Sequence, residues 1–162
     1  MQDVELKGHA KVDKIDLQII RFLSKDGRTP FAQIAKELGV SNGMVRQRYQ
    51  RLVQDGVLQI VAITNPLLMG FATMAQIGVK ADVSRLEEIA EEIAEFEEVV
   101  YLVLVTGSYD LHVEVVCRDK IHLLNFLTKK LHGVKGVKEA ETFMYLRIAK
   151  ENYGWAGNMG DK

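Results

Sequence analysis

Two short amphipathic segments separated by a tight break constrain the fold of this chain more than any other feature. Residues 29–54 read TPFAQIAKELGVSNGMVRQRYQRLVQ, and the break is the LGVS at residues 38–41. Gly39 can adopt the left-handed backbone conformation that ends a helix, and Ser41 can accept a free backbone N–H at the start of the next helix. The pattern therefore predicts a helix-turn-helix.

The second of these helices is predicted to have one buried face and one exposed face. Its apolar stripe at helical spacing consists of Val45, Tyr49, Leu52 and Val53. No acidic residue occurs between Ser41 and Gln54, and the opposite face carries guanidinium and carboxamide groups. Such groups hydrogen-bond to phosphates and base edges in the major groove. The pattern therefore predicts contact with double-stranded DNA.

The residues expected to contact DNA all belong to this helix and its cap. They are Ser41, Asn42, Gly43, Met44, Arg46, Gln47, Arg48, Gln50 and Arg51. Arginine suits guanine or phosphate, and glutamine suits adenine. Two alternatives stay open. The face could be an ordinary solvated surface that is basic by composition, and Arg48, nearest the apolar stripe, could brace the domain as well as contact phosphate.

The flanking segments complete an N-terminal domain. A preceding helix is expected to start at Asp13 or Asp16 and to end near Asp26. Pro30 is expected where the next helix begins, with Thr29 as its cap. After the third helix, residues 57–63 (VLQIVAI) have β character and take the position of a wing. We predict a winged helix-turn-helix domain over residues 1–63.

The remainder of the chain alternates between strand and helix patterns. Strands are expected at 71–80, 99–106, 111–117 and 138–149, and helices at 83–96 and 120–131. The order βαββαβ is that of the ferredoxin-like arrangement. The predicted fold class is therefore α+β, with this second domain at 71–150, a linker at 64–70 and a tail at 151–162. The helix at 120–131 is expected to bury Ile121, Leu124, Leu127 and Leu131.

The strand around residues 99–105 suggests how the domain assembles. Its sequence, VVYLVLV, shows no polar alternation, so both of its faces are expected to be buried. Two helices can cover only one face of a four-stranded sheet. The other face must pack against an apolar surface, and the same sheet of a second subunit would provide one. We therefore expect an isologous homodimer.

Motifs in both halves make the chain similar to the Lrp/AsnC (feast/famine) family of transcription regulators. In the first half they include Asp26-Gly27-Arg28, Ile34-Ala35, Leu38-Gly39-Val40-Ser41 and Gly56-Val57, and in the second half Thr106-Gly107-Ser108-Tyr109-Asp110, which resembles the family's T-G-x-Y/F-D turn. The resemblance implies a ligand-sensing domain of the RAM type, dimers that assemble into tetramers or octamers, and a response to amino acids. Tyr49 departs from the family, which commonly has a smaller aliphatic residue there.

The turn at residues 106–110 has two interpretations. Gly and Asp are ordinary turn residues, so the segment could be a hairpin turn and nothing more. A glycine beside a carboxylate can also present backbone N–H groups and an acceptor to the charged ends of a free amino acid. The resemblance favours that role, and the expected effector-binding residues are Thr106, Gly107, Ser108, Tyr109 and Asp110.

Composition and charge exclude several other classes. No apolar run approaches the ~20 residues of a membrane span, and no signal-peptide pattern is present. Cys117 is the only cysteine, which excludes an internal disulfide and fits the cytoplasm. The four histidines lack metal-ligand spacing, and no nucleophile, phosphate loop or cofactor motif occurs. We therefore expect no metal, no cofactor, no catalytic residue and no enzymatic activity.

Charge divides the chain in the same way as the motifs do. Residues 1–63 carry ten Lys and Arg against seven Asp and Glu, whereas residues 64–162 carry eleven against fifteen. The sequence thus predicts a cytoplasmic, sequence-specific DNA-binding regulator that a small molecule, expected to be an amino acid, modulates. The alternatives are a ligand-independent architectural DNA-binding protein, and a metabolic sensor or enzyme whose helical domain binds protein.

Overall fold

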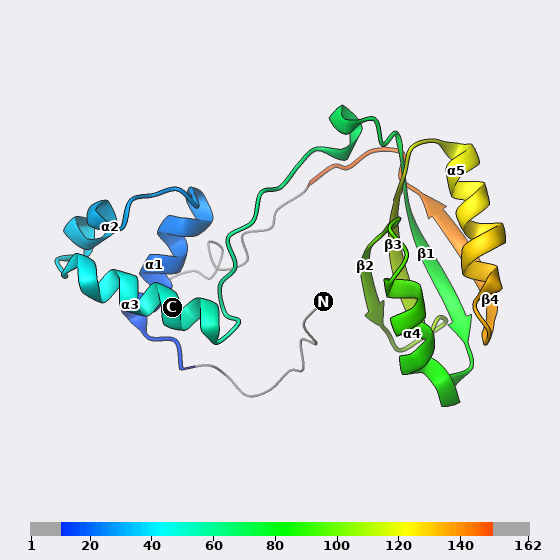
Figure 1. Cartoon of the computed structure of the whole chain (residues 1–162), viewed down its shortest axis with the longest axis horizontal. Helices are drawn as coiled ribbons and strands as arrows, with labels where there is room; N and C mark the ends of the chain where they lie inside the picture. Colours follow the sequence, from blue (N-terminus) through cyan, green and yellow to red (C-terminus); the bar gives the residue numbers. More distant parts are fainter. Residues whose placement is uncertain (1–10, 151–162) are drawn as a thin grey trace. The chain divides into compact units, whose positions relative to one another are not determined.

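A computed structural model describes residues 11–150, which fall into two compact units with a boundary between Ala62 and Ile63 (Figure 1). The expected tail at 151–162 lies outside the described residues. No helix among residues 11–150 is long and apolar enough to cross a membrane.

Three helices form the N-terminal unit: α1 (Lys14–Lys25), α2 (Phe31–Leu38) and α3 (Asn42–Gln54). Asp13 and Asp16 cap α1 reciprocally, each side chain accepting the backbone N–H of the other, at 2.9 and 3.0 Å. Gly39 has a φ of 66°, and Ser41 Oγ accepts the Met44 N–H at 3.1 Å. The predicted helix-turn-helix is therefore confirmed. Its buried core contains Ile19, Leu23, Ile34, Ala35 and Val45.

The expected cap of α2 is wrong. The Thr29 hydroxyl donates to the Asp26 carbonyl at 2.7 Å, which closes the turn that follows α1. Pro30 is the N-cap residue, with no side-chain cap hydrogen bond, and α2 begins one residue later at Phe31. The hydroxyl is therefore used by the preceding turn rather than by the following helix.

The strand expected at residues 57–63 is also not formed. This segment is extended, but no other strand pairs with it among the described residues. Its apolar side chains are exposed at Ile60, Val61 and Ile63. A strand needs a partner for its backbone N–H and C=O groups, and the helical unit supplies none. Within residues 11–62 the unit is a helix-turn-helix without a wing strand.

The C-terminal unit has the predicted βαββαβ order. Its strands are β1 (Thr73–Ala81), β2 (Val99–Leu104), β3 (Leu111–Cys117) and β4 (Val137–Met144). They form one antiparallel sheet in the order β2-β3-β1-β4. The helices α4 (Leu86–Ala94) and α5 (Lys120–Asn125) cover one face of this sheet (Figure 1). The predicted α+β, ferredoxin-like arrangement is confirmed.

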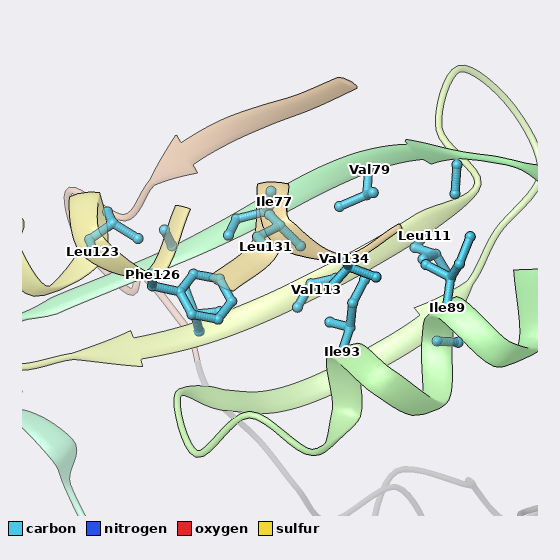
Figure 2. Packing of buried hydrophobic residues seen from close by; sticks show 14 of the residues in the cluster. Ile77, Val79, Ile89, Ile93, Leu111, Val113, Leu123, Phe126, Leu131 and Val134 are labelled. Atoms are coloured by element: carbon cyan, nitrogen blue, oxygen red, sulfur yellow. The ribbon is translucent and has the colours of Figure 1, made fainter. Parts of the chain in front are cut away.

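The core of this unit lies between the sheet and the two helices. Ile77 on β1 and Val113 on β3 face Ile93 on α4 and Phe126 just beyond α5 (Figure 2). All four are essentially fully buried. Burial of one such side chain contributes about 1.5–3 kcal/mol relative to exposure. This packing holds the strands, and therefore the turn between β2 and β3, on a rigid base.

The buried side of α5 differs from the expectation. Ile121 and Leu124 are 66% and 54% exposed, whereas Leu123 and Phe126 are buried. Phe126–Lys130 is a π-helical turn, which is wider than an α-helical turn. Phe126 and Leu131, five residues apart, therefore both face the core. The expectation is therefore wrong for Ile121 and Leu124, whereas Leu131 is buried and Leu127 packs against the core as expected.

Several element ends also differ from the expectation. β2 ends at Leu104 and β4 at Met144, and β1 starts at Thr73 rather than residue 71. The helix expected at 83–96 begins as a 3-10 turn, Val83–Arg85, and becomes α-helical at Leu86. None of these shifts changes the order of the elements.

Candidate functional sites

The exposed face of α3 is the first candidate site. Val45 and Leu52 are buried, and Tyr49 packs against Phe31 with ring centroids 5.0 Å apart. This contact accommodates the aromatic residue at position 49 within the core. The exposed residues of the cap and helix are Ser41, Asn42, Gly43, Met44, Arg46, Gln47, Gln50, Arg51, Val53 and Gln54. Val53 was expected in the buried stripe, but it is 41% exposed. The helix therefore presents one continuous surface without an acidic group.

Two of the arginines on α3 have partners inside the domain. Arg48 Nη1 donates to Asp16 Oδ1 at 2.9 Å and to Asp13 Oδ2 at 2.5 Å. Arg51 Nη2 donates to the other carboxylate oxygen of Asp16. The Asp16 side chain is 0% exposed, and the side chains of Arg48 and Arg51 are 24% and 44% exposed. Arg48 and Arg51 therefore fasten α3 to α1, which is the bracing role that the sequence left open for Arg48.

The acid at the centre of this contact could have been found from the sequence. Asp16 lies three, four and seven residues before Ile19, Ile20 and Leu23, so it occupies the buried stripe of α1. A carboxylate there needs a cationic partner. Its neighbour Asp13 accepts the Asp16 backbone N–H and the Arg48 guanidinium, and these hydrogen bonds hold the pKa of Asp13 below its ordinary value.

The turn between β2 and β3 is the second candidate site. Gly107 has a φ of 133°, a conformation that favours glycine. Asp110 is bound to the sheet, because its backbone N–H donates to the Val79 carbonyl and its Oδ2 accepts the Ala81 N–H, both at 2.9 Å. The carboxylate of Asp110 thus anchors the turn. Thr106, Gly107 and Ser108 are exposed.

The ring of Tyr109 lies over β1 at a glycine. A Cβ atom placed on Gly78 would come within 2.7 Å of the ring, so only a glycine leaves space for the tyrosine. The ring also contacts His112 and Phe143, with centroid distances of 5.9 and 6.4 Å. A lone glycine inside a strand signals such a close approach, so Gly78 is a signal in the sequence that could have revealed this contact.

A hollow of about 190 Å³ opens beside this ring. Its lining consists of Lys80, Ser108, Tyr109, Glu139, Ala140 and Glu141. Of the five predicted effector-binding residues, the structure brings Ser108 and Tyr109 to this hollow and not Thr106, Gly107 or Asp110. Lys80 Nζ donates to Glu139 Oε2 at 2.8 Å, and this hydrogen bond raises the pKa of Lys80. The β1 and β4 residues were missed because only the sheet register joins them.

The sheet face opposite the helices carries aromatic and polar side chains together. Gln76 pairs with Glu114 on β3 and with Phe143 on β4, so the three side chains share this face. Gln76 Nε2 lies 3.2 Å from His112 Nδ1. Tyr101, on the edge strand β2, is 58% exposed. Among the described residues, no helix of the C-terminal unit covers this face, and the ring of Tyr109 covers it at Gly78.

A further cluster of ionisable groups is structural. Glu98, which is buried, accepts Lys130 Nζ at 2.7 and 2.8 Å and lies 3.0 Å from His122 Nε2. Burial opposes ionisation of Glu98, yet the hydrogen bonds from Lys130 and His122 hold its pKa below the ordinary value. Burial also raises the pKa of the Cys117 thiol to about 11. No group of three or more potential metal ligands occurs among residues 11–150.

Two protein-family models match the chain and divide it as the structure does. Residues 12–53 match the AsnC-type helix-turn-helix domain, and residues 74–155 match the Lrp/AsnC ligand binding domain.

Two archaeal relatives match along most of their length. An uncharacterized HTH-type transcriptional regulator of Pyrococcus horikoshii is 34% identical over 144 residues, which is 88% of this chain and 91% of that protein. The HTH-type transcriptional regulator Ptr1 of Methanocaldococcus jannaschii is 34% identical over 141 residues, 86% of this chain and 95% of that protein.

Solved structures with lower sequence identity share the fold. Escherichia coli AsnC superposes with a TM-score of 0.82 at 23% identity, covering 88% of this chain and 97% of that one. A transcriptional regulator from Neisseria meningitidis, solved in complex with L-Met, has a TM-score of 0.80 at 22% identity, covering 88% and 94%. A feast or famine regulatory protein from M. tuberculosis, complexed with L-methionine, has a TM-score of 0.80 at 24% identity, covering 88% and 97%.

Proposed function

The chain belongs to the Lrp/AsnC family of transcriptional regulators, and on that premise we propose that it binds specific double-stranded DNA through α3 and an amino acid beside the turn at residues 106–110. The observation that carries the first half is the exposed, acid-free face of α3. The second half rests on the hollow beside Tyr109. Regulation then consists of coupling between these two binding events.

In the DNA complex, the N-terminal part of α3 enters the major groove. Arg46, Gln47 and Gln50 read base edges, since their side chains are exposed and have no ion-pair partner among residues 11–150. The DNA backbone and the first bases are approached by Ser41, Asn42, Gly43 and Met44. Arg48 and Arg51 contribute positive potential, but their guanidiniums remain paired with Asp16, so they act mainly by holding α3 at its angle to α1.

The effector lies in the hollow between the turn and the β1–β4 pair. Ser108 and Tyr109 contact it directly, and Thr106 and Gly107 shape the turn. Asp110 acts through its anchor on Ala81 rather than as a ligand group. An amino acid is the ligand class because relatives of the same fold were solved with L-methionine.

Dimerisation completes the proposal. The uncovered face of the sheet, with Tyr101 and Phe143 exposed, packs against the same face of a second copy. Such a dimer brings two α3 helices to one DNA site, which compensates for the small positive charge of a single N-terminal unit. Dimers then associate into tetramers or octamers. The proposed location of this assembly is the cytoplasm.

A test of the DNA interface compares three variants in fluorescence anisotropy against the duplex upstream of the protein's own gene. Arg46→Ala and Gln47→Ala should each weaken binding by about 1–3 kcal/mol and reduce discrimination between specific and random duplexes. Lys129→Ala, an exposed site in the C-terminal unit, removes the same charge as Arg46→Ala and is the control. Equal affinities for Arg46→Ala and Lys129→Ala would show that the face of α3 does not read DNA.

A further inference from the structure

The lining of the hollow beside Tyr109 carries more negative than positive charge. Of the charged residues that line it, Lys80 is basic and Glu139 and Glu141 are acidic. We infer that Glu141 is a specificity-determining residue of the effector site, and that it selects an amino acid with a cationic side chain, of the lysine or arginine type. This inference rests on the proposed effector function and names the ligand class of the same site.

Glu141 is the carboxylate that is available to a ligand. Glu139 is occupied by Lys80 Nζ at 2.8 Å, and Asp110 Oδ2 accepts the Ala81 N–H at 2.9 Å. The side chain of Glu141, which is exposed, makes no hydrogen bond or ion pair with any residue in the range 11–150. Its charge acts on Lys80 only at longer range. A ligand ammonium or guanidinium would give this carboxylate its partner.

The sheet register places an aromatic ring beside that carboxylate. Glu141 on β4 pairs directly with Gly78 on β1. Gly78 has no side chain, and the ring of Tyr109 covers it. Glu141 and Tyr109 both line the hollow. A carboxylate next to an aromatic face favours a cation over an apolar group of the same shape, since both attract positive charge.

The turn can hold the other end of the ligand. In the turn, the backbone N–H groups of residues 106–109 donate to no backbone carbonyl among the described residues. Such groups can bind the α-carboxylate of a free amino acid. The hollow, at about 190 Å³, is smaller than the ~300–1,000 Å³ of sites for drug-sized ligands, which suits a single amino acid.

The experiment is isothermal titration calorimetry of the full-length protein at 0.15 M salt, about physiological ionic strength, with four probes. L-Lysine is the test ligand, and L-norleucine lacks only its side-chain ammonium. Cadaverine lacks the α-carboxylate, and L-methionine represents the neutral ligands of related structures. We expect L-lysine to bind at least about tenfold more tightly than each of the other three.

A pair of variants assigns the selectivity to one residue. Glu141→Gln keeps the shape but removes the charge, and should weaken L-lysine binding about fivefold while leaving L-norleucine binding unchanged, as expected for a partly solvated ion pair. Glu91→Gln, at an exposed site on α4, is the matched control and should bind like the wild type.

The other outcomes separate this inference from the proposed function. Tighter binding of L-methionine or L-norleucine than of L-lysine would overturn the selectivity and leave an amino-acid effector intact. Cadaverine binding as tightly as L-lysine would overturn the inference, because the turn would then not recognise an amino acid. Absence of binding by all four probes would overturn both the inference and the proposed amino-acid effector. Wild-type selectivity in the Glu141→Gln variant would overturn only the role of Glu141.

Discussion

At the scale of single residues, arginines on the same helix have different environments. Arg46 is exposed and available to DNA, whereas Arg48, two positions on, is tied to Asp13 and Asp16. The difference follows from the helical period, which turns position 48 towards α1 and position 46 away from it. Counting arginines on α3 therefore overstates the number of groups that can read bases.

Removal of the buried carboxylate should weaken the N-terminal unit. We expect Asp16→Asn to lower the free energy of unfolding by about 1–3 kcal/mol, because Arg51 loses its ionic partner and Arg48 keeps only Asp13. The partial exposure of both arginines keeps the cost below that of a fully buried pair. Urea denaturation measures the change, and Glu37→Gln, at an exposed site on α2, is the control. A loss below about 0.5 kcal/mol, the range of neutral surface changes, would contradict the bracing role.

The tyrosine over the glycine gives a prediction that separates the two functions. In Gly78→Ala, the added methyl group would lie 2.7 Å from the Tyr109 ring, so the ring must move. We expect amino-acid binding, measured by calorimetry, to weaken at least about tenfold. DNA affinity without amino acid should be unchanged, since α3 lies in the other unit. Wild-type ligand binding by this variant would mean that the ring does not form part of the effector site.

At the scale of elements, the sequence predicted the features that neighbouring residues determine and missed those that depend on distant contacts. The helix ends at Gly39 and Ser41, and the order of the C-terminal elements, follow from neighbouring residues and were predicted. The π-helical turn at 126–130 depends on packing, and the unpaired state of segment 57–63 depends on the lack of a partner strand. Neither feature was predicted. The contact of Lys80 with Glu139 joins residues 59 positions apart, which no periodicity reveals.

The buried side of the segment formed by α5 and the π-helical turn can be tested with one buried and one exposed residue. Phe126→Ala should lower the free energy of unfolding by about 3–5 kcal/mol, since the ring is 1% exposed and contacts Phe96. Ile121→Ala should cost less than about 0.5 kcal/mol, because its side chain is 66% exposed. Denaturant melts of both variants give the comparison. Similar losses of unfolding free energy in the two variants would mean that Ile121 is buried, as regular α-helical spacing predicts.

At the scale of the whole molecule, the uncovered sheet face is the feature on which the proposed dimer rests. Helices α4 and α5 cover only one side of the sheet, and β2 carries Val100 and Tyr101, each 58% exposed, at its edge. A monomer would leave these side chains exposed to water, together with Phe143 on β4 at the opposite edge of the sheet. Large exposed apolar side chains on a face that no helix covers indicate an interaction site.

A charge placed on that face should separate the subunits. We expect Phe143→Glu to give a monomer by light scattering at micromolar concentration, because each subunit of an isologous dimer would bury an unpaired carboxylate in place of an aromatic ring. Val83→Glu adds the same charge to an exposed apolar site near α4 and should leave the wild-type mass. A circular-dichroism melt checks that both variants fold. An unchanged mass for a folded Phe143→Glu protein would place the interface elsewhere.

The central claim is that one molecule joins DNA reading by α3 to amino-acid binding in the C-terminal unit. The most direct measurement is a fluorescence-anisotropy titration of the full-length protein against its own upstream duplex, over a range of salt, with and without the twenty amino acids. We predict affinity that falls steeply with salt and shifts when the amino acids are present. Binding that is absent, or that neither salt nor amino acids change, would contradict the account.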